Sequence, residues 1–216
     1  MSASCGHDHY HHDHGAAAAT PAYRRVLWIA LAVNLAMFAV EVASGLGASS
    51  VSLLADSLDF LGDAANYGVS LFVLGMELQW RVRASLLKGA TMAAFGLWVL
   101  FVTVRHALAG TVPDSAAMGA VGMLALLANL GVAALLYRYR NGDSNMVSVW
   151  ICTRNDVIGN LAVLTAAAGV FGTGIGWPDL LVGAIMAALA LGGAWRVIRQ
   201  ASVELRALPP VVHAAE

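Results

Sequence analysis

The sequence predicts an all-α integral membrane protein with six transmembrane helices, and three observations support this. Hydrophobic residues make up 59% of the 216 residues and charged residues only 12%, and the mean hydropathy is +0.72. Apolar stretches close to the roughly 20 residues that cross a bilayer recur along the chain. Lys and Arg gather between alternate stretches. The net charge of −1 is uninformative, but the few charges sit mainly between apolar segments and form no patch for nucleic acid. The two cysteines are far apart in sequence, which indicates no disulfide framework.

Six stretches have the length and composition of membrane spans. In order, they are Val26–Gly47, Val51–Met76, Ala84–Leu108, Met118–Tyr137, Met146–Phe171 and Pro178–Ile198. The first and second are divided by the short turn at Ala48–Ser50, and the others by polar or basic segments. Gly and Ala are dense in every span, which predicts close helix packing. An even number of spans leaves both termini on one side.

Basic residues orient the chain. They precede the first span and follow the second, fourth and sixth: Arg24, Arg25, Arg81, Arg83, Lys88, Arg138, Arg140, Arg196, Arg199 and Arg206. The opposite loops, Ala48–Ser50, Ala109–Ala117 and Gly172–Trp177, contain no Lys or Arg. The positive-inside rule therefore predicts cytoplasmic N- and C-termini in the cytoplasmic (inner) membrane.

The chain is expected to hold one membrane domain, residues 24–202, between a tail at 1–23 and a short cytoplasmic tail at 203–216. The first tail has no apolar core for a signal peptide, so we expect a flexible cytoplasmic segment. It carries His7, His9, His11, His12 and His14. These side chains suit zinc, nickel or cobalt, and the two readings are a metal-collecting tail and a merely solvated cluster.

Acids lie inside two of the predicted spans, at a spacing that places them on one helix face. Asp59 and Asp63 are four residues apart in the second span, and Cys152 and Asp156 are four apart in the fifth. A charged group in the bilayer costs several kcal/mol without a partner, and such groups mark transport pathways. Three carboxylates and one sulfur therefore predict a four-ligand metal site. The alternative is that each acid pairs with a basic residue such as Arg105 or Arg154.

The depths of the two pairs favour a shared site. The second and fifth spans run antiparallel. At 1.5 Å per residue, Asp59 and Asp63 lie roughly 12 and 18 Å below the outer surface, while Cys152 and Asp156 lie roughly 9 and 15 Å above the inner one. In a core about 30 Å thick, both pairs straddle the middle.

Four further polar residues lie near these pairs. Asn66 and Asn160 follow Asp63 and Asp156 by one turn, where they would orient a ligand or, as we favour, tie helices together. Asp56 shares the face of Asp59 and is either an exit-path acid or a packing residue. Glu41 in the first span is expected to reach the outer interface.

These residues resemble the cation diffusion facilitator family of divalent metal transporters. The resemblance covers nearly all of Val26–Ala201 and is carried by SVSLLADSLDFLGDAANYGVSL and SVWICTRNDVIGN. It implies a cation-efflux-like transmembrane domain with a tetrahedral transport site at Asp59, Asp63, Cys152 and Asp156. Asn34, Phe38, Glu41, Gly45 and Asp179 also look like family positions, with structural or access-path roles.

The chain departs from that family in two ways. Many members carry histidine where Asp59 and Cys152 stand, and most continue into a cytoplasmic metal-binding domain. We expect this chain to belong to a subgroup without that domain, so that a homodimer would rest on helix contacts alone.

The expected function is proton-coupled efflux of divalent transition-metal ions by alternating access. The mixed oxygen and sulfur ligands favour Zn²⁺ or Cd²⁺, with Co²⁺, Ni²⁺, Fe²⁺ and Mn²⁺ as alternatives. The ion is the transported substrate, no resident cofactor is expected, and the other partners are protons and the lipid bilayer. Clustered acids cannot all stay ionised in an empty site, so metal binding would release protons. The competing functions are a passive metal channel and an intramembrane metalloenzyme, although no His-Glu zinc motif supports the latter.

Overall fold

The computed structural model describes residues 21–72, 78–139 and 144–207. Within these ranges, the side chains at 72, 78, 81, 144–152, 154 and 155 lie outside the description. The described residues form six helices: α1 (Pro21–Gly47), α2 (Val51–Phe72), α3 (Leu78–Ala109), α4 (Ser115–Tyr137), α5 (Ser144–Thr173) and α6 (Trp177–Ala207). Each corresponds to one expected span. The largest differences are at α3, which begins six residues earlier than expected, and α6, which continues nine residues past Ile198.

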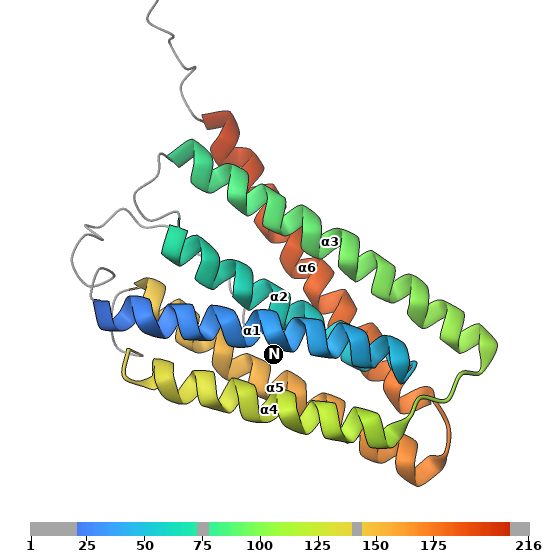
Figure 1. The fold of residues 1–216 in the computed structure, drawn as a ribbon. Coiled ribbons are helices and arrows are strands. Elements are labelled where there is room, and N and C mark those ends of the chain that lie inside the picture. Colours follow the sequence, from blue (N-terminus) through green and yellow to red (C-terminus); the bar gives the residue numbers. More distant parts are fainter. Residues whose placement is uncertain (1–20, 73–77, 140–143, 208–216) are drawn as a thin grey trace, which may run out of the picture.

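Helix α2 is the centre of the bundle, because it contacts each of the other five helices (Figure 1). Every residue from Val51 to Leu58 is buried. Around it, α1 packs on α2, α4 packs on α5, and α3 packs mainly on α6. The polar residues of α2 are therefore surrounded mainly by other helices, which is the arrangement that intramembrane acids require.

The outward faces of the helices around α2 carry exposed apolar side chains. Large apolar side chains point away from the bundle on α3, α5 and α6, among them Leu87, Phe101, Leu108, Phe171 and Trp195. Contiguous exposed apolar area on this scale fits a bilayer rather than water. Among the residues that the structure describes, five helical segments are long and apolar enough to span a membrane: Pro21–Gly47, Val82–Ala109, Ser115–Tyr137, Asp156–Thr173 and Trp177–Arg206. Helix α2 is not among them, since it holds three acids in 22 residues.

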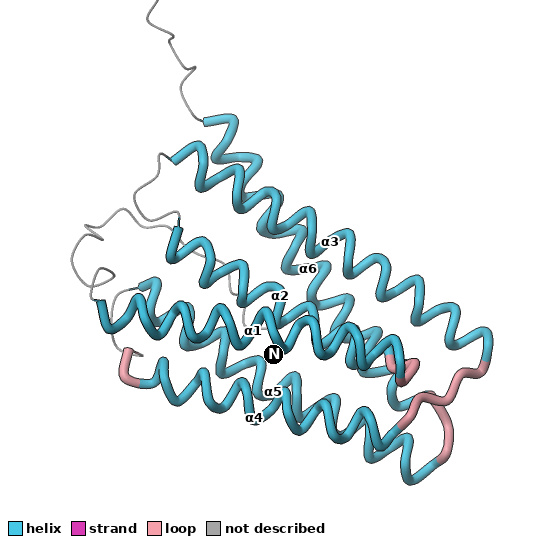
Figure 2. Tube along the Cα trace, in the orientation of Figure 1, coloured by secondary structure: helices cyan, strands magenta, loops and turns pink. Residues whose placement is uncertain are grey.

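The described loops between α1 and α2, α3 and α4, and α5 and α6 lie at one end of the bundle (Figure 2). They contact one another, since the backbone N–H of Asp114 donates to the carbonyl of Ala48 at 3.0 Å. A Cβ on Gly176 would stand only 2.2 Å from the carbonyl oxygen of Thr111, so only glycine fits there. This end, which holds no Lys or Arg in its loops, is called the loop end below.

Close backbone approach also joins α6 to α2 at the loop end. A Cβ on Gly183 would lie 2.8 Å from the carbonyl carbon of Val51 and 2.9 Å from the amide nitrogen of Ser52. These distances are below any real Cβ contact, and the neighbouring atoms are backbone, which cannot move aside. Small residues at helix contacts were expected from the composition, and Gly183 shows where one of those contacts lies.

Candidate metal and proton site

The first turns of α2 are held by Asp179 of α6. Its carboxylate accepts hydrogen bonds from the hydroxyl of Ser50 at 2.7 Å, the amide of Val51 at 2.8 Å, and both the amide and hydroxyl of Ser52 at 3.0 and 2.6 Å. The first amides of a helix have no partner within the helix, and an acid there also offsets the positive end of the helix dipole. Asp179 therefore caps α2 from another helix, which is a structural role.

Beyond this cap, helical spacing places Asp56, Asp59 and Asp63 in the middle of α2. Asp56 is fully buried and Asp63 is buried, while Asp59 is partly buried. Helix α5 passes closely beside them at Gly159. A Cβ at that position would lie 3.4 Å from Oδ2 of Asp59 and 3.6 Å from Oδ1 of Asp56. The predicted meeting of α2 and α5 at the acids is therefore present in the structure.

Asp156 joins the acids of α2 from the neighbouring turn of α5. Its carboxyl group interacts electrostatically with those of Asp63 and Asp59. Its Oδ2 atom is buried with no hydrogen-bond donor. Carboxyl groups that meet in this way attract protons or a cation, because like charges in a dry site repel one another strongly.

Two hydroxyl groups orient Asp63. The Tyr67 hydroxyl donates to Oδ2 of Asp63 at 3.0 Å and lies 2.9 Å from the hydroxyl oxygen of Thr153. Tyr67 is one turn beyond Asp63 on α2, and Thr153 comes from α5, so this link crosses the same interface. Such contacts fix the direction of a carboxylate before it binds an ion. Neither residue was expected at the site, although the four-residue spacing of Asp63 and Tyr67 places them on one face of α2.

The cation that acts on Asp63 is Lys88 of α3. Its ammonium group donates to Oδ1 of Asn66 and interacts electrostatically with Asp63. Lys88 was expected on the cytoplasmic side with the other basic residues; in the structure it lies within α3, partly buried, with its ammonium group on Asn66 of α2. Arg105, which was considered as a counter-charge, is exposed, and the side chain of Arg154 is outside the description.

Neither asparagine is hydrogen-bonded to the acid that it follows by one helical turn. Asn160 donates to both carboxylate oxygens of Asp56, at 3.1 and 2.9 Å, rather than to Asp156. Its own carbonyl oxygen accepts from Asn129 of α4 at 3.2 Å. Asn66 accepts from Lys88. Asn160 thus ties α5 to α2 and α4, and Asn66 ties α2 to α3, in agreement with the favoured helix-tying role.

The expectation for Glu41 was wrong. It was placed at the outer interface, yet its side chain is fully buried inside the bundle. Its carboxyl group interacts electrostatically with that of Asp56, and neither of its oxygens has a hydrogen-bond partner. The cause is helical phase, because Glu41 shares the inward face of α1 with Asn34, Met37 and Gly45.

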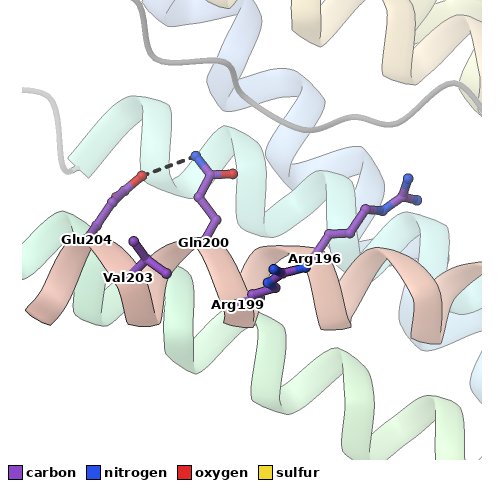
Figure 3. Close-up of a pocket in the computed structure, with 5 residues that line it drawn as sticks. All are labelled: Arg196, Arg199, Gln200, Val203 and Glu204. Atoms are coloured by element: carbon purple, nitrogen blue, oxygen red, sulfur yellow. Dashed lines mark hydrogen bonds between the residues drawn. The ribbon is translucent and has the colours of Figure 1, made fainter.

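The four-ligand metal site stays a prediction. Among the described side chains, no group of three or more His, Cys, Asp or Glu is arranged to hold a metal ion. Cys152 lies in α5, but its side chain is one of those outside the description, as are all five histidines of the tail. One surface pocket, drawn in Figure 3, lies on α6 and is lined by Arg196, Arg199, Gln200, Val203 and Glu204. It contains none of the buried acids.

Comparisons with known proteins agree with these observations. Residues 27–206 match the family described as the cation efflux transmembrane domain. The chain is 20% identical over 205 residues to the metal cation efflux system protein CzcD of Cupriavidus metallidurans, covering 89% of this chain and 65% of that protein. It is 21% identical over 194 residues to the cadmium, cobalt and zinc/H(+)-K(+) antiporter of Bacillus subtilis, covering 82% and 62%. The chain thus spans slightly less than two thirds of these relatives.

Proposed function

Because the chain belongs to the cation efflux family, we propose that it exports divalent transition-metal ions across the cytoplasmic membrane in exchange for protons. One observation carries the proposal: Asp59 and Asp63 of the central helix α2 meet Asp156 of α5 in the interior of the bundle. Acids from two different helices that meet inside the bundle form a site whose access depends on how those helices pack, which is the kind of site that alternating access requires. The family relatives are named as efflux systems and antiporters.

The proposed ligands are Asp59, Asp63, Cys152 and Asp156. Carboxylate oxygens combined with a thiolate suit four-coordinate Zn²⁺ or Cd²⁺, whereas Mg²⁺ and Ca²⁺ require more oxygens and reject sulfur. The acids would hold protons when the site is empty and release them when the metal binds. Asp56 would lie next to this site, towards the loop end, as an acid on the exit path. In the absence of metal, the Lys88 ammonium would balance part of the charge of Asp63.

The proposed orientation places the loop end outside. Arg24 and Arg25 in α1, Arg138 after α4, and Arg196 and Arg199 in α6 all lie towards the opposite end of their helices. By the positive-inside rule that end, with both termini, would be cytoplasmic. The proton gradient of a respiring cell would then drive metal outwards.

The experiment is zinc uptake into inverted vesicles driven by an imposed pH gradient. Asp63→Ala and Asp156→Ala are expected to abolish uptake, because each removes a ligand and a proton carrier. Asp114→Ala is the matched control, since Asp114 is a carboxylate at the exposed start of α4 that contacts only local amides. Undiminished uptake by either site variant would contradict the assignment. Uptake that ignored the pH gradient would indicate a passive channel, and peptide turnover by the purified protein would indicate a metalloenzyme.

Cys152 sets the expected metal preference. Sulfur favours softer ions than imidazole does, so Cys152→His is expected to lower the ratio of cadmium to zinc transport. Competitive flux in reconstituted vesicles measures that ratio, and an equal ratio in both proteins would refute the role of the thiolate.

For the histidines of residues 1–15, deletion of Met1–Gly15 is expected to weaken apparent affinity for the metal and to leave transport intact.

A further inference from the structure

The surface pocket on α6 lies outside the proposed metal site and has a different chemistry. Its two cationic side chains, Arg196 and Arg199, are exposed on the same stretch of helix (Figure 3). No acid among the described residues forms an ion pair with either guanidinium group. The lining acid Glu204 instead accepts from the side-chain amide of Gln200 at 3.1 Å. Two neighbouring guanidinium groups without an acidic partner suit an anion, and the fork of donors on arginine matches phosphate in particular.

The position of the pocket along α6 corresponds to the headgroup level of a bilayer. Trp177 and Trp195 are both strongly exposed on this helix. At 1.5 Å per residue they lie about 27 Å apart along the axis, close to the roughly 30 Å of a hydrocarbon core. Exposed tryptophans gather at the two membrane interfaces. Arg196 directly follows Trp195, so the arginines begin where the hydrocarbon is expected to end.

Apolar side chains continue the same face of α6 towards the middle of the membrane. Leu181, Ile185 and Leu189 are exposed, and their helical spacing places them on the face that carries Arg196 and Arg199. One lipid molecule on this face would lay an acyl chain along the apolar residues and its phosphate against the arginines.

Helix α3 repeats this combination beside α6. The two helices pack along their length, and a Cβ on Gly89 would lie only 2.7 Å from Cγ1 of Ile198 (Figure 1). Further towards the same end, the guanidinium carbon of Arg83 lies 5.1 Å from the centre of the Trp80 ring, and both residues are exposed. A second exposed Arg–Trp pair at this end supports the placement of the pocket at a membrane interface.

We propose that the pocket binds the headgroup phosphate of an anionic phospholipid, in the leaflet at the end opposite the loop end. Two cations need a ligand with net negative charge, which a zwitterionic headgroup does not supply, and basic residues near a membrane surface favour anionic lipids. None of the proposed metal ligands takes part. The lipid site would therefore be present whether or not the chain transports metal.

The test measures lipid binding to the purified full chain in neutral detergent by native mass spectrometry, with phosphatidylglycerol and phosphatidylcholine of identical acyl chains. The wild type is expected to bind phosphatidylglycerol more tightly, by roughly fivefold for each arginine. Arg196→Gln combined with Arg199→Gln should remove most of this preference. Arg24→Gln combined with Arg25→Gln is the matched control, since it removes the same charge from exposed arginines of α1 at the same end, outside the pocket. The control should keep the wild-type preference.

Two further measurements separate a shaped site from surface charge. Arg196→Lys combined with Arg199→Lys keeps the charge but loses the planar fork, so it should retain only part of the preference. Quenching by brominated phosphatidylglycerol, taken as the difference between the wild type and Trp195→Phe, should exceed quenching by brominated phosphatidylcholine. The excess should shrink as ionic strength rises.

Four results would overturn the proposal. One is an unchanged lipid preference in the Gln variant of Arg196 and Arg199. Another is an equal loss in the control variant, which would indicate general surface charge. Displacement of the bound lipid by millimolar inorganic phosphate would indicate a site for the free anion. A changed oligomeric state of the Gln variant with an unchanged lipid preference would indicate a contact between two copies of the chain.

Discussion

Asp179 and Glu41 are both buried acids in the bundle, and their surroundings are opposite. Asp179 is 1% exposed and accepts four hydrogen bonds from residues 50–52. Glu41 is 0% exposed, and neither of its oxygens has a donor. A buried carboxylate with several donors is stabilised in its charged form, and one without donors is a cost to the fold. The number of donors, rather than burial alone, thus separates an acid that holds the fold together from one that is available to bind a proton or an ion.

The largest expected loss of stability follows from substitution of Asp179. Asp179→Ala would leave two amides and two hydroxyls at the start of α2 without their acceptor, at a cost of about 1–3 kcal/mol for each unsatisfied group. We expect a large loss of thermal stability in detergent, measured by fluorescence-detected size exclusion. Asp114→Ala, the control, removes an exposed helix cap and should cost only about 1 kcal/mol. Equal losses in the two variants would show that the buried cap is no more important than a surface one.

The next effect is at Gly183, which holds the same end of α2. Gly183→Ala would place a methyl group against the backbone of Val51 and Ser52 and should cost about 1–3 kcal/mol through overpacking. Gly192→Ala, in the same helix with open space around it, should instead stabilise by about 0.5–1 kcal/mol. Unfolding midpoints of both variants in one detergent test this, and a Gly183→Ala protein as stable as the wild type would contradict the close approach.

The smallest expected change in stability, a gain rather than a loss, is at Glu41. Glu41→Met replaces a buried acid without donors by an apolar side chain of similar length. Replacement of poorly paired buried charges by apolar groups is often neutral or stabilising, so we expect a gain of about 1 kcal/mol. The same thermal assay measures it. A loss as large as that of Asp179→Ala would remove the contrast between the two acids.

Much of the fold follows from the sequence, because span length and apolar composition are local properties. All six expected spans correspond to helices, and their ends at Gly47, Val51 and Tyr137 were placed correctly. The meeting of α2 and α5 followed from helix direction and rise alone. Helix ends beyond the bilayer region were less predictable, as the extension of α6 to Ala207 illustrates, since polar residues there give no periodic signal.

The contacts of single polar side chains could not be predicted in this way. The partners of Asn160, Lys88 and Glu41 depend on how each helix is rotated towards its neighbours. Position along the sequence suggested the interface for Glu41 and the cytoplasm for Lys88. Rotation about the helix axis turns both of them inwards instead. Asp179 looked like a family position, but only the packing of α6 against the start of α2 shows that it caps that helix.

The central position of α2 has a consequence for reading topology from composition. Because five neighbouring helices surround it, α2 can carry three acids inside the bundle. These acids exclude α2 from the apolar membrane-spanning segments, so the described residues show five such segments. An odd count would put the two ends of the chain on opposite faces of the membrane. The helix that carries the acids of the proposed site is therefore the one on which an even number of spans depends.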